Sequence, residues 1–138
     1  MDFIERVKAA GVVGAGGAGF PTHVKLSAKA ELLIVNAAEC EPLIEVDKYL
    51  CRTFAPDIVR GVSAAARHLG ARAVVAIKSD YRAEIGALRS AIQERGADIS
   101  IFEMASFYPA GDEQVMVQLV TGRSIPERGL PLDVGAVV

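Results

Sequence analysis

The stretch ARAVVAIKSDYRAEIGALRSAIQERGADISIFEM, residues 71–104, decides the fold. It begins with residues 71–78, whose apolar run AVVAI is typical of a buried strand. Apolar side chains then recur at helical spacing over residues 81–95, and a second strand is expected over residues 98–104. Strand, helix and strand in this order predict two parallel strands joined by a crossover helix.

The same alternation extends on both sides of this unit. ELLIVN, residues 31–36, reads as another buried strand, and helical segments follow it as far as Gly70. Downstream, a short helix is expected over residues 112–122 and an apolar strand over residues 134–138. We therefore predict an α/β fold of three layers, in which a mainly parallel sheet lies between helices.

Composition agrees with one compact domain over the whole chain of 138 residues, of which 51% are apolar and 23% charged. The net charge is −2, with both signs interspersed, so nucleic-acid binding has weak support. Nothing in the sequence approaches the roughly 20 apolar residues that a membrane span requires. We expect a cytoplasmic protein without a membrane span of its own, which can still be peripheral to a larger assembly.

Two further features concern the cysteines and the end of the chain. Cys40 and Cys51 lie eleven positions apart and form no C-x-x-C unit, so we expect reduced thiols, at least one of them packed, and no metal site. The chain ends inside the apolar strand over residues 134–138, which indicates a fragment of a longer protein.

The glycine-rich segment GVVGAGGAGFPTHVKL, residues 11–26, raises the question of a cofactor. Three of its glycines fit the dinucleotide fingerprint G-x-G-x-x-G, namely Gly14, Gly16 and Gly19. That fingerprint follows a strand, whereas here Asp2 is expected to cap a short helix over residues 3–10. Pro21 also blocks a long helix directly afterwards. A nicotinamide-binding Rossmann domain therefore stays only as an alternative.

The physical meaning of these glycines does not depend on the fingerprint. A phosphate loop of the Walker A type is excluded because Phe20 stands where that motif needs a lysine. Dense glycines nevertheless let the backbone approach a planar or anionic ligand and offer several N–H groups to it. Lys25 follows closely enough to add a positive charge. A flexible surface loop is the competing interpretation.

A second loop, NAAECEP over residues 36–42, follows the predicted strand ELLIVN. It places Glu39 and Glu41 at the carboxyl end of a parallel strand, which is where open α/β sheets bind ligands. Asn36 can both donate to and accept from the amide edge of a heterocycle. An ordinary polar turn explains the same residues.

A third loop, YPAGDE over residues 108–113, is predicted at the same edge of the sheet. Asp112 and Glu113 either lie near a bound redox ligand or simply favour the first turn of a helix through its macrodipole. Because the three loops are expected to converge, they predict a cofactor crevice.

Together and in this order, the stretches GAGGAGFPTHVKL, LIVNAAECEP and YPAGDE resemble the flavin- and NADH-binding fold of the NADH-oxidising subunit of respiratory complex I. They are more similar still to the C subunit of Rnf electron-transport complexes and to the cobalamin reductase of propanediol-utilisation microcompartments. The closing stretch TGRSIPERGLPLDVGAVV resembles the same group, so the resemblance covers nearly the whole chain. It implies an N-terminal domain that passes electrons from NADH through FMN to iron–sulfur clusters outside this chain, with other subunits or domains as partners.

The resemblance also implies which residues bind the cofactors. They are Gly14, Gly16, Gly17, Ala18, Gly19, Phe20, Lys25, Asn36, Glu39 and Tyr108 around the flavin, and Asp112 and Glu113 near the nicotinamide. Because the hydride passes between the two cofactors, no catalytic acid or base is expected. Ala15 and Ala38 replace a charged residue of the complex I pattern, which fits the Rnf-like branch. A non-catalytic docking module of the same fold is the alternative function.

Overall fold

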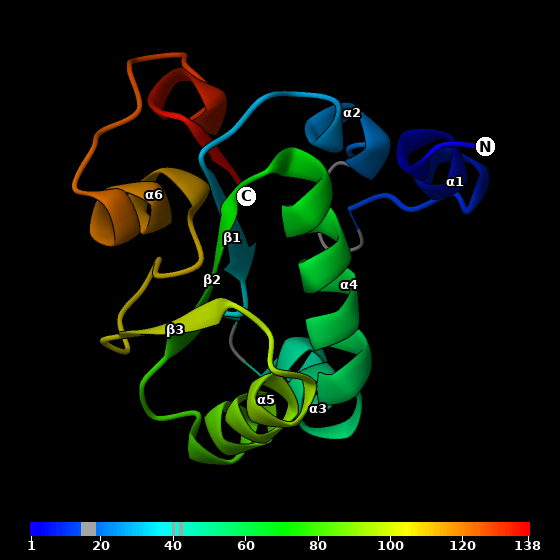
Figure 1. Cartoon of the computed structure of the whole chain (residues 1–138). Helices are drawn as coiled ribbons and strands as arrows, with labels where there is room; N and C mark the ends of the chain where they lie inside the picture. The colour runs from blue at the N-terminus through cyan, green and yellow to red at the C-terminus, as the bar shows by residue number, and fades with distance from the viewer. Residues whose placement is uncertain (15–18, 40, 42) are drawn as a thin grey trace.

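The computed structural model describes residues 1–14, 19–39, 41 and 43–138. Its elements, in chain order, are α1 (Phe3–Ala9), α2 (Thr22–Leu26), β1 (Leu32–Asn36), α3 (Val46–Thr53), α4 (Ala55–Leu69), β2 (Arg72–Lys78), α5 (Arg82–Arg95), β3 (Ile99–Met104), α6 (Glu113–Thr121), the 3₁₀ turn η1 (Pro131–Val134) and β4 (Ala136–Val137). The strands form one sheet with helices on both faces (Figure 1).

The sheet has the order β3-β2-β1-β4, and each of its three pairings is parallel. This confirms the predicted α/β fold with a parallel sheet. The last strand is shorter than predicted, because residues 131–134 form a 3₁₀ turn that ends at Gly135 with a φ of 82°. Only Ala136 and Val137 remain to pair with Leu32 and Leu33 of β1.

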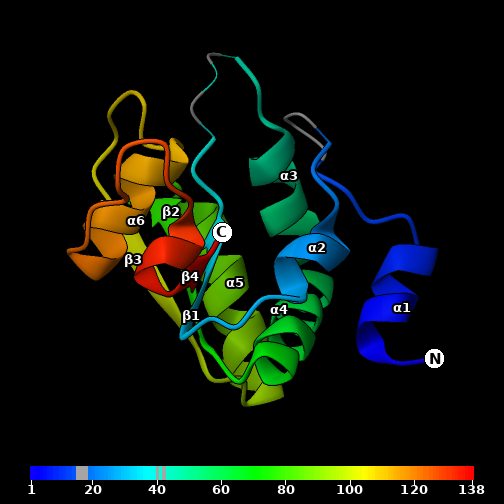
Figure 2. The same cartoon turned by 90° about the horizontal axis from the view of Figure 1, so that it is seen from above.

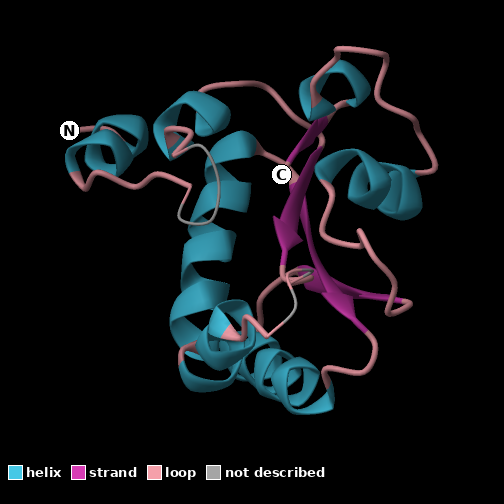
Figure 3. Cartoon of the chain, turned by 180° about the vertical axis from the view of Figure 1, so that it is seen from behind, coloured by secondary structure: helices cyan, strands magenta, loops and turns pink. Residues whose placement is uncertain are grey.

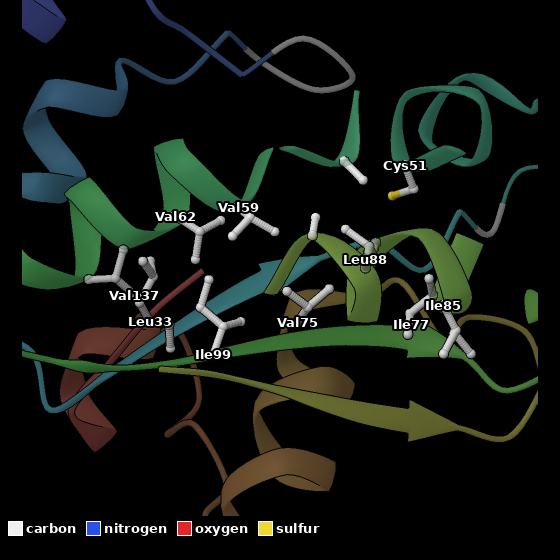
Figure 4. Close-up of a cluster of buried hydrophobic side chains, with 14 residues drawn as sticks. Leu33, Cys51, Val59, Val62, Val75, Ile77, Ile85, Leu88, Ile99 and Val137 are labelled. Atoms are coloured by element: carbon white, nitrogen blue, oxygen red, sulfur yellow. The ribbon is translucent and has the colours of Figure 1, made fainter. Parts of the chain in front are cut away.

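Apolar side chains cover both faces of the sheet, which explains the predicted three layers. On one face α3, α4 and α5 pack on the strands, as Figure 4 shows for side chains such as Val59, Leu88 and Val75. On the other face Met116 and Val117 of α6 pack against Ile34. Figure 3 shows α6 and η1 on the opposite side of the strands from α3, α4 and α5.

The covering helices are fixed at their ends and to one another. Both α4 and α5 end at glycines in the left-handed region, Gly70 and Gly96, as the sequence predicts. The buried carboxylate of Glu84 on α5 accepts a hydrogen bond from the guanidinium of Arg52 on α3, and Cys51 packs beside it as a buried free thiol. The expectation that at least one cysteine packs is confirmed, while Cys40 lies outside the described residues.

The chain begins with α1, which lies on the outside of the molecule next to α2 (Figure 2). Asp2 caps it, since its carboxylate accepts a hydrogen bond from the amide of Glu5 at 2.8 Å. Between α1 and Gly14, the described residues contain no strand beyond an isolated bridge from Val13 to Pro21. The Rossmann alternative, which requires a strand there, is therefore wrong.

The connections place a switch point between β1 and β4. The helices that join β1 to β2 and β2 to β3 cover one face, whereas α6, which joins β3 to β4, covers the other. Open α/β sheets bind ligands outside the carboxyl ends of the strands at such a point. Within the described part of the chain, no helix is long and apolar enough to span a membrane.

Candidate functional site

A cavity of about 330 Å³ lies against β4, beside the switch point of the sheet. Three of the predicted cofactor residues line it, namely Phe20, Lys25 and Glu113. The described residues that complete its lining are Val24, Leu130, Pro131, Leu132, Ala136, Val137 and Val138. The structure therefore brings the glycine-rich segment and the third loop to one hollow with largely apolar walls and one charge of each sign.

Lys25 is held at this cavity by two contacts. Its ammonium donates a hydrogen bond of 2.9 Å to the carbonyl oxygen of Val138, and it lies 5.5 Å from the centre of the Phe20 ring. Because an ammonium carries three donor hydrogens, Lys25 can still bind an anionic group of a ligand. The site thus offers a fixed positive charge beside an aromatic face.

Two backbone hydrogen bonds join residues 12–14 of the glycine-rich segment to residues 20–22. The amide of Gly14 donates to the carbonyl of Phe20 at 3.0 Å, and the amide of Thr22 donates to that of Val12 at 3.1 Å. Gly19 has a φ of 68°, a conformation that favours glycine. Gly16, Gly17 and Ala18, which the resemblance implies as flavin contacts, lie outside the described residues.

Asn36, the last residue of β1, joins the second loop to the third. Its side-chain amide donates to the carbonyl of Gly111 at 2.9 Å, while its side-chain oxygen accepts from the amide of Ala38 at 3.1 Å. One side chain therefore shapes its own turn and holds the start of α6 close to it. Convergence of the two loops at the carboxyl end of the sheet is what the sequence predicts.

Two other predicted residues are placed differently. Asp112 is the N-cap of α6, where one oxygen of its carboxylate accepts from the amides of Gln114 at 3.0 Å and Val115 at 3.1 Å. Tyr108 is 74% exposed, and neither residue lines the cavity. Asp112 thus has a capping role at the start of the helix, while the neighbouring Glu113 reaches the cavity.

Glu39 also lies away from the cavity, toward β2 and α3. Its main-chain carbonyl accepts hydrogen bonds from the ammonium of Lys78 at 2.7 Å and from the hydroxyl of Tyr81 at 3.1 Å. Burial, together with the nearby carboxylate of Asp47, raises the pKa of the Glu39 carboxyl. The second loop thus contains an acid whose neutral form is favoured relative to a free glutamate.

Sequence reasoning missed two parts of this site. No cofactor contact is predicted in the segment 123–133, between the last expected helix and the last expected strand, yet its apolar residues Leu130 and Leu132 form a wall of the cavity. Lys78 and Tyr81 were not singled out either, although a lysine directly after the apolar run AVVAI is a detectable signal at the end of a strand. The arrangement suits a flat, largely apolar ligand that carries an anionic group.

Comparison with known proteins shows which family this chain resembles. Residues 7–138 match the family of the Nuo51 FMN-binding domain, of the complex I 51K type. The cobalamin reductase PduS of Citrobacter freundii is 48% identical over 135 residues, which cover 97% of this chain and 29% of that protein. The C subunit of the ion-translocating oxidoreductase complex of Pseudomonas aeruginosa is 42% identical over 140 residues, which cover 98% of this chain and 18% of that protein.

Among solved structures, an NAD⁺-reducing [NiFe]-hydrogenase in its H₂-reduced state is similar, with a TM-score of 0.78 and 28% sequence identity. The likeness covers 87% of this chain and 24% of the hydrogenase chain. The chain thus spans less than a third of the length of these relatives. Because the family match extends over nearly all of the sequence, this chain belongs to the family of FMN-binding domains of the complex I 51K type.

Proposed function

We propose that this chain is the FMN-binding, NADH-oxidising part of an electron-transfer oxidoreductase similar to cobalamin reductase and to the C subunit of Rnf complexes. The observation that carries the proposal is the cavity at the switch point, with Lys25, Phe20 and Glu113 in its lining. Its volume of about 330 Å³ falls within the roughly 300–1,000 Å³ typical of small-molecule sites. The residues present therefore fit a flat cofactor with a phosphate.

Each side chain has a role in binding or orientation. Lys25 supplies a positive charge for the phosphate, and Phe20 offers an aromatic face for a planar ring. Asn36 holds two loops together, and Glu113 places a carboxylate at the cavity for the polar part of a second ligand. When bound, FMN supplies a ring that accepts a hydride from NADH and passes electrons on singly.

The remaining predictions follow from the same proposal. We propose that residues 1–138 act as one flavin- and NADH-binding domain at the N-terminal end of a longer protein. The iron–sulfur clusters that take up the electrons would lie outside these residues, in other domains or subunits. The location would be the cytoplasm, peripheral to a membrane complex or inside a microcompartment.

A titration of the protein with FMN, followed by NADH, tests this proposal. We expect quenching of FMN fluorescence on binding, and bleaching of the visible flavin band when NADH is added without oxygen. The longer protein is titrated alongside, because it provides any flavin contacts beyond Val138. If neither protein binds FMN, the proposed function is wrong.

A second candidate, a docking module without catalytic activity, is favoured by one observation. The segment between β1 and α3 and the outer side of α3 expose several large apolar side chains: Leu43, Ile44, Val46, Tyr49 and Leu50. Exposed apolar patches mark surfaces that contact other proteins. This candidate predicts association with a partner by a protein that binds neither FMN nor NADH, so the same titration separates the two functions.

A further inference from the structure

Two side chains from one turn donate hydrogen bonds to the main chain of the second loop. Lys78 is the last residue of β2, and Tyr81 is the N-cap of α5 three positions later. Both donate to the carbonyl oxygen of Glu39, Lys78 at 2.7 Å and Tyr81 at 3.1 Å. A carbonyl with two lone pairs can accept both bonds, and the bond from the ammonium is charge-assisted.

These two hydrogen bonds begin where the hydrogen-bond ladder of the sheet ends. The amide of Ala37 still donates to the carbonyl of Ala76 at 2.9 Å, and that is the last sheet-like bond of this segment among the described residues. Two positions later, the carbonyl of Glu39 has left the ladder and takes up Lys78 and Tyr81 instead. Donors from the end of β2 and from the turn after it therefore restrain the path of the loop after β1.

The turn that supplies the donors is itself well fixed. The amide of Tyr81 donates to the carbonyl of Lys78 at 3.0 Å, so the two side chains leave from one hydrogen-bonded turn. The ammonium groups of Lys48 and Lys78 lie 4.8 Å and 5.8 Å from the centre of the Tyr81 ring. Burial, followed by the carboxylate of Asp80, raises the pKa of Tyr81, so its hydroxyl keeps the proton that it donates.

We propose that Lys78 and Tyr81 are positioning residues that hold residues 36–39 in the conformation needed for flavin binding. The inference rests on the proposed function and deepens it. Asn36, at the other end of this short segment, is bonded to Gly111 before α6. Because only two residues separate Asn36 from Glu39, we expect a displacement of Glu39 to shift Asn36, which joins the second loop to the third.

Three variants test the proposal by FMN titration. Lys78→Met removes the charged donor and is expected to weaken FMN binding roughly tenfold, whereas Tyr81→Phe removes one neutral bond and weakens it about threefold. Lys78→Arg keeps a charged donor and restores most of the affinity. Arg89→Gln on α5 is the matched control, because it breaks only an exposed ion pair with Glu103.

Two further readouts separate positioning from general stability. The position and shape of the visible band of bound flavin are expected to change in Lys78→Met and Tyr81→Phe but not in Arg89→Gln. Hydrogen exchange of the amides in residues 37–39 is expected to accelerate in both variants, with or without FMN. Tyr81→Phe removes only one oxygen atom, so it keeps the test valid if Lys78→Met unfolds.

The outcomes distinguish this inference from the proposed function. If neither the unmodified protein nor its longer form binds FMN, the proposed function fails. If hydrogen exchange at residues 37–39 is also unchanged in the Lys78→Met and Tyr81→Phe variants, the two side chains do not restrain this segment either. If FMN binds to the unmodified protein and equally to Tyr81→Phe, Lys78→Met and Arg89→Gln, the positioning role is wrong and the proposed function stands.

Discussion

The ammonium of Lys25 donates a hydrogen bond of 2.9 Å to the main-chain carbonyl of Val138, 113 positions later in the chain. This bond joins α2, at the end of the glycine-rich segment, to the residue just after β4. The cation is consequently fixed at the rim of the cavity that Phe20 and Glu113 also line. A long, flexible side chain thereby becomes an ordered positive charge before any ligand arrives.

Lys25→Met is expected to weaken FMN binding roughly tenfold or more, because it removes a charge-assisted contact with the phosphate. Isothermal titration calorimetry or fluorescence quenching measures the change. Lys29→Met is the control, since it removes an exposed lysine charge from the connection between α2 and β1, outside the cavity. Equal affinities of the two variants would contradict a role for Lys25 in binding.

Asn36→Asp separates the two hydrogen bonds of this side chain. The carboxylate can still accept from the amide of Ala38, but it cannot donate to the carbonyl of Gly111. We expect a loss of about 1 kcal/mol in the free energy of unfolding, measured with urea, and faster hydrogen exchange around residues 108–112. Exchange that stays unchanged there would show that the bond does not restrain the third loop.

The strands β1 and β2 could be predicted from the sequence because each is a local signal. The runs over residues 32–35 and 73–77 are continuous and apolar, so burial on both faces of a sheet removes them from water. The ends of α4 and α5 were equally clear, since Gly70 and Gly96 supply the left-handed residue that ends a helix. These signals require no knowledge of distant parts of the chain.

The site could be predicted only in part, because its contacts join distant segments. The position of Lys25 at the cavity depends on Val138, and the cavity wall depends on Leu130 and Leu132, which no local pattern relates to the glycine-rich segment. For Asp112 the sequence offered two roles, and the hydrogen bonds at the start of α6 show that its carboxylate caps the helix. Contacts between distant segments decided the first two cases, whereas the bonds of Asp112 are local to the start of α6.

Asp112→Ala is expected to lower the free energy of unfolding by about 1 kcal/mol, within the range of roughly 0.5–2 kcal/mol measured for lost N-caps. The reason is that the amides of Gln114 and Val115 lose their acceptor at the start of α6. Chemical denaturation measures the loss, and Asp112→Ser is the control, because a serine hydroxyl can still cap the helix. If Asp112→Ser is as unstable as Asp112→Ala, the role of this carboxylate is not capping.

Cys51 predicts how stability depends on pH in the alkaline range. Burial, followed by the carboxylates of Asp47 and Glu84, raises the pKa of its thiol to about 11. In the unfolded chain the same thiol ionises near pH 8.5, so between these values the unfolded state has fewer bound protons than the folded state. The contribution of Cys51 to stability is therefore complete below about pH 8.5 and is lost as the pH rises toward 11.

This contribution can be isolated in a Cys40→Ser background, in which Cys51 is the only thiol. The matched control carries Cys51→Ala as well, so every other alkaline titration, including that of Tyr81, is common to both proteins. We expect the difference in unfolding free energy between them to shrink by roughly 2–3 kcal/mol from pH 8 to pH 11. Parallel pH profiles would contradict the raised pKa, because a thiol that ionises equally in both states contributes no slope.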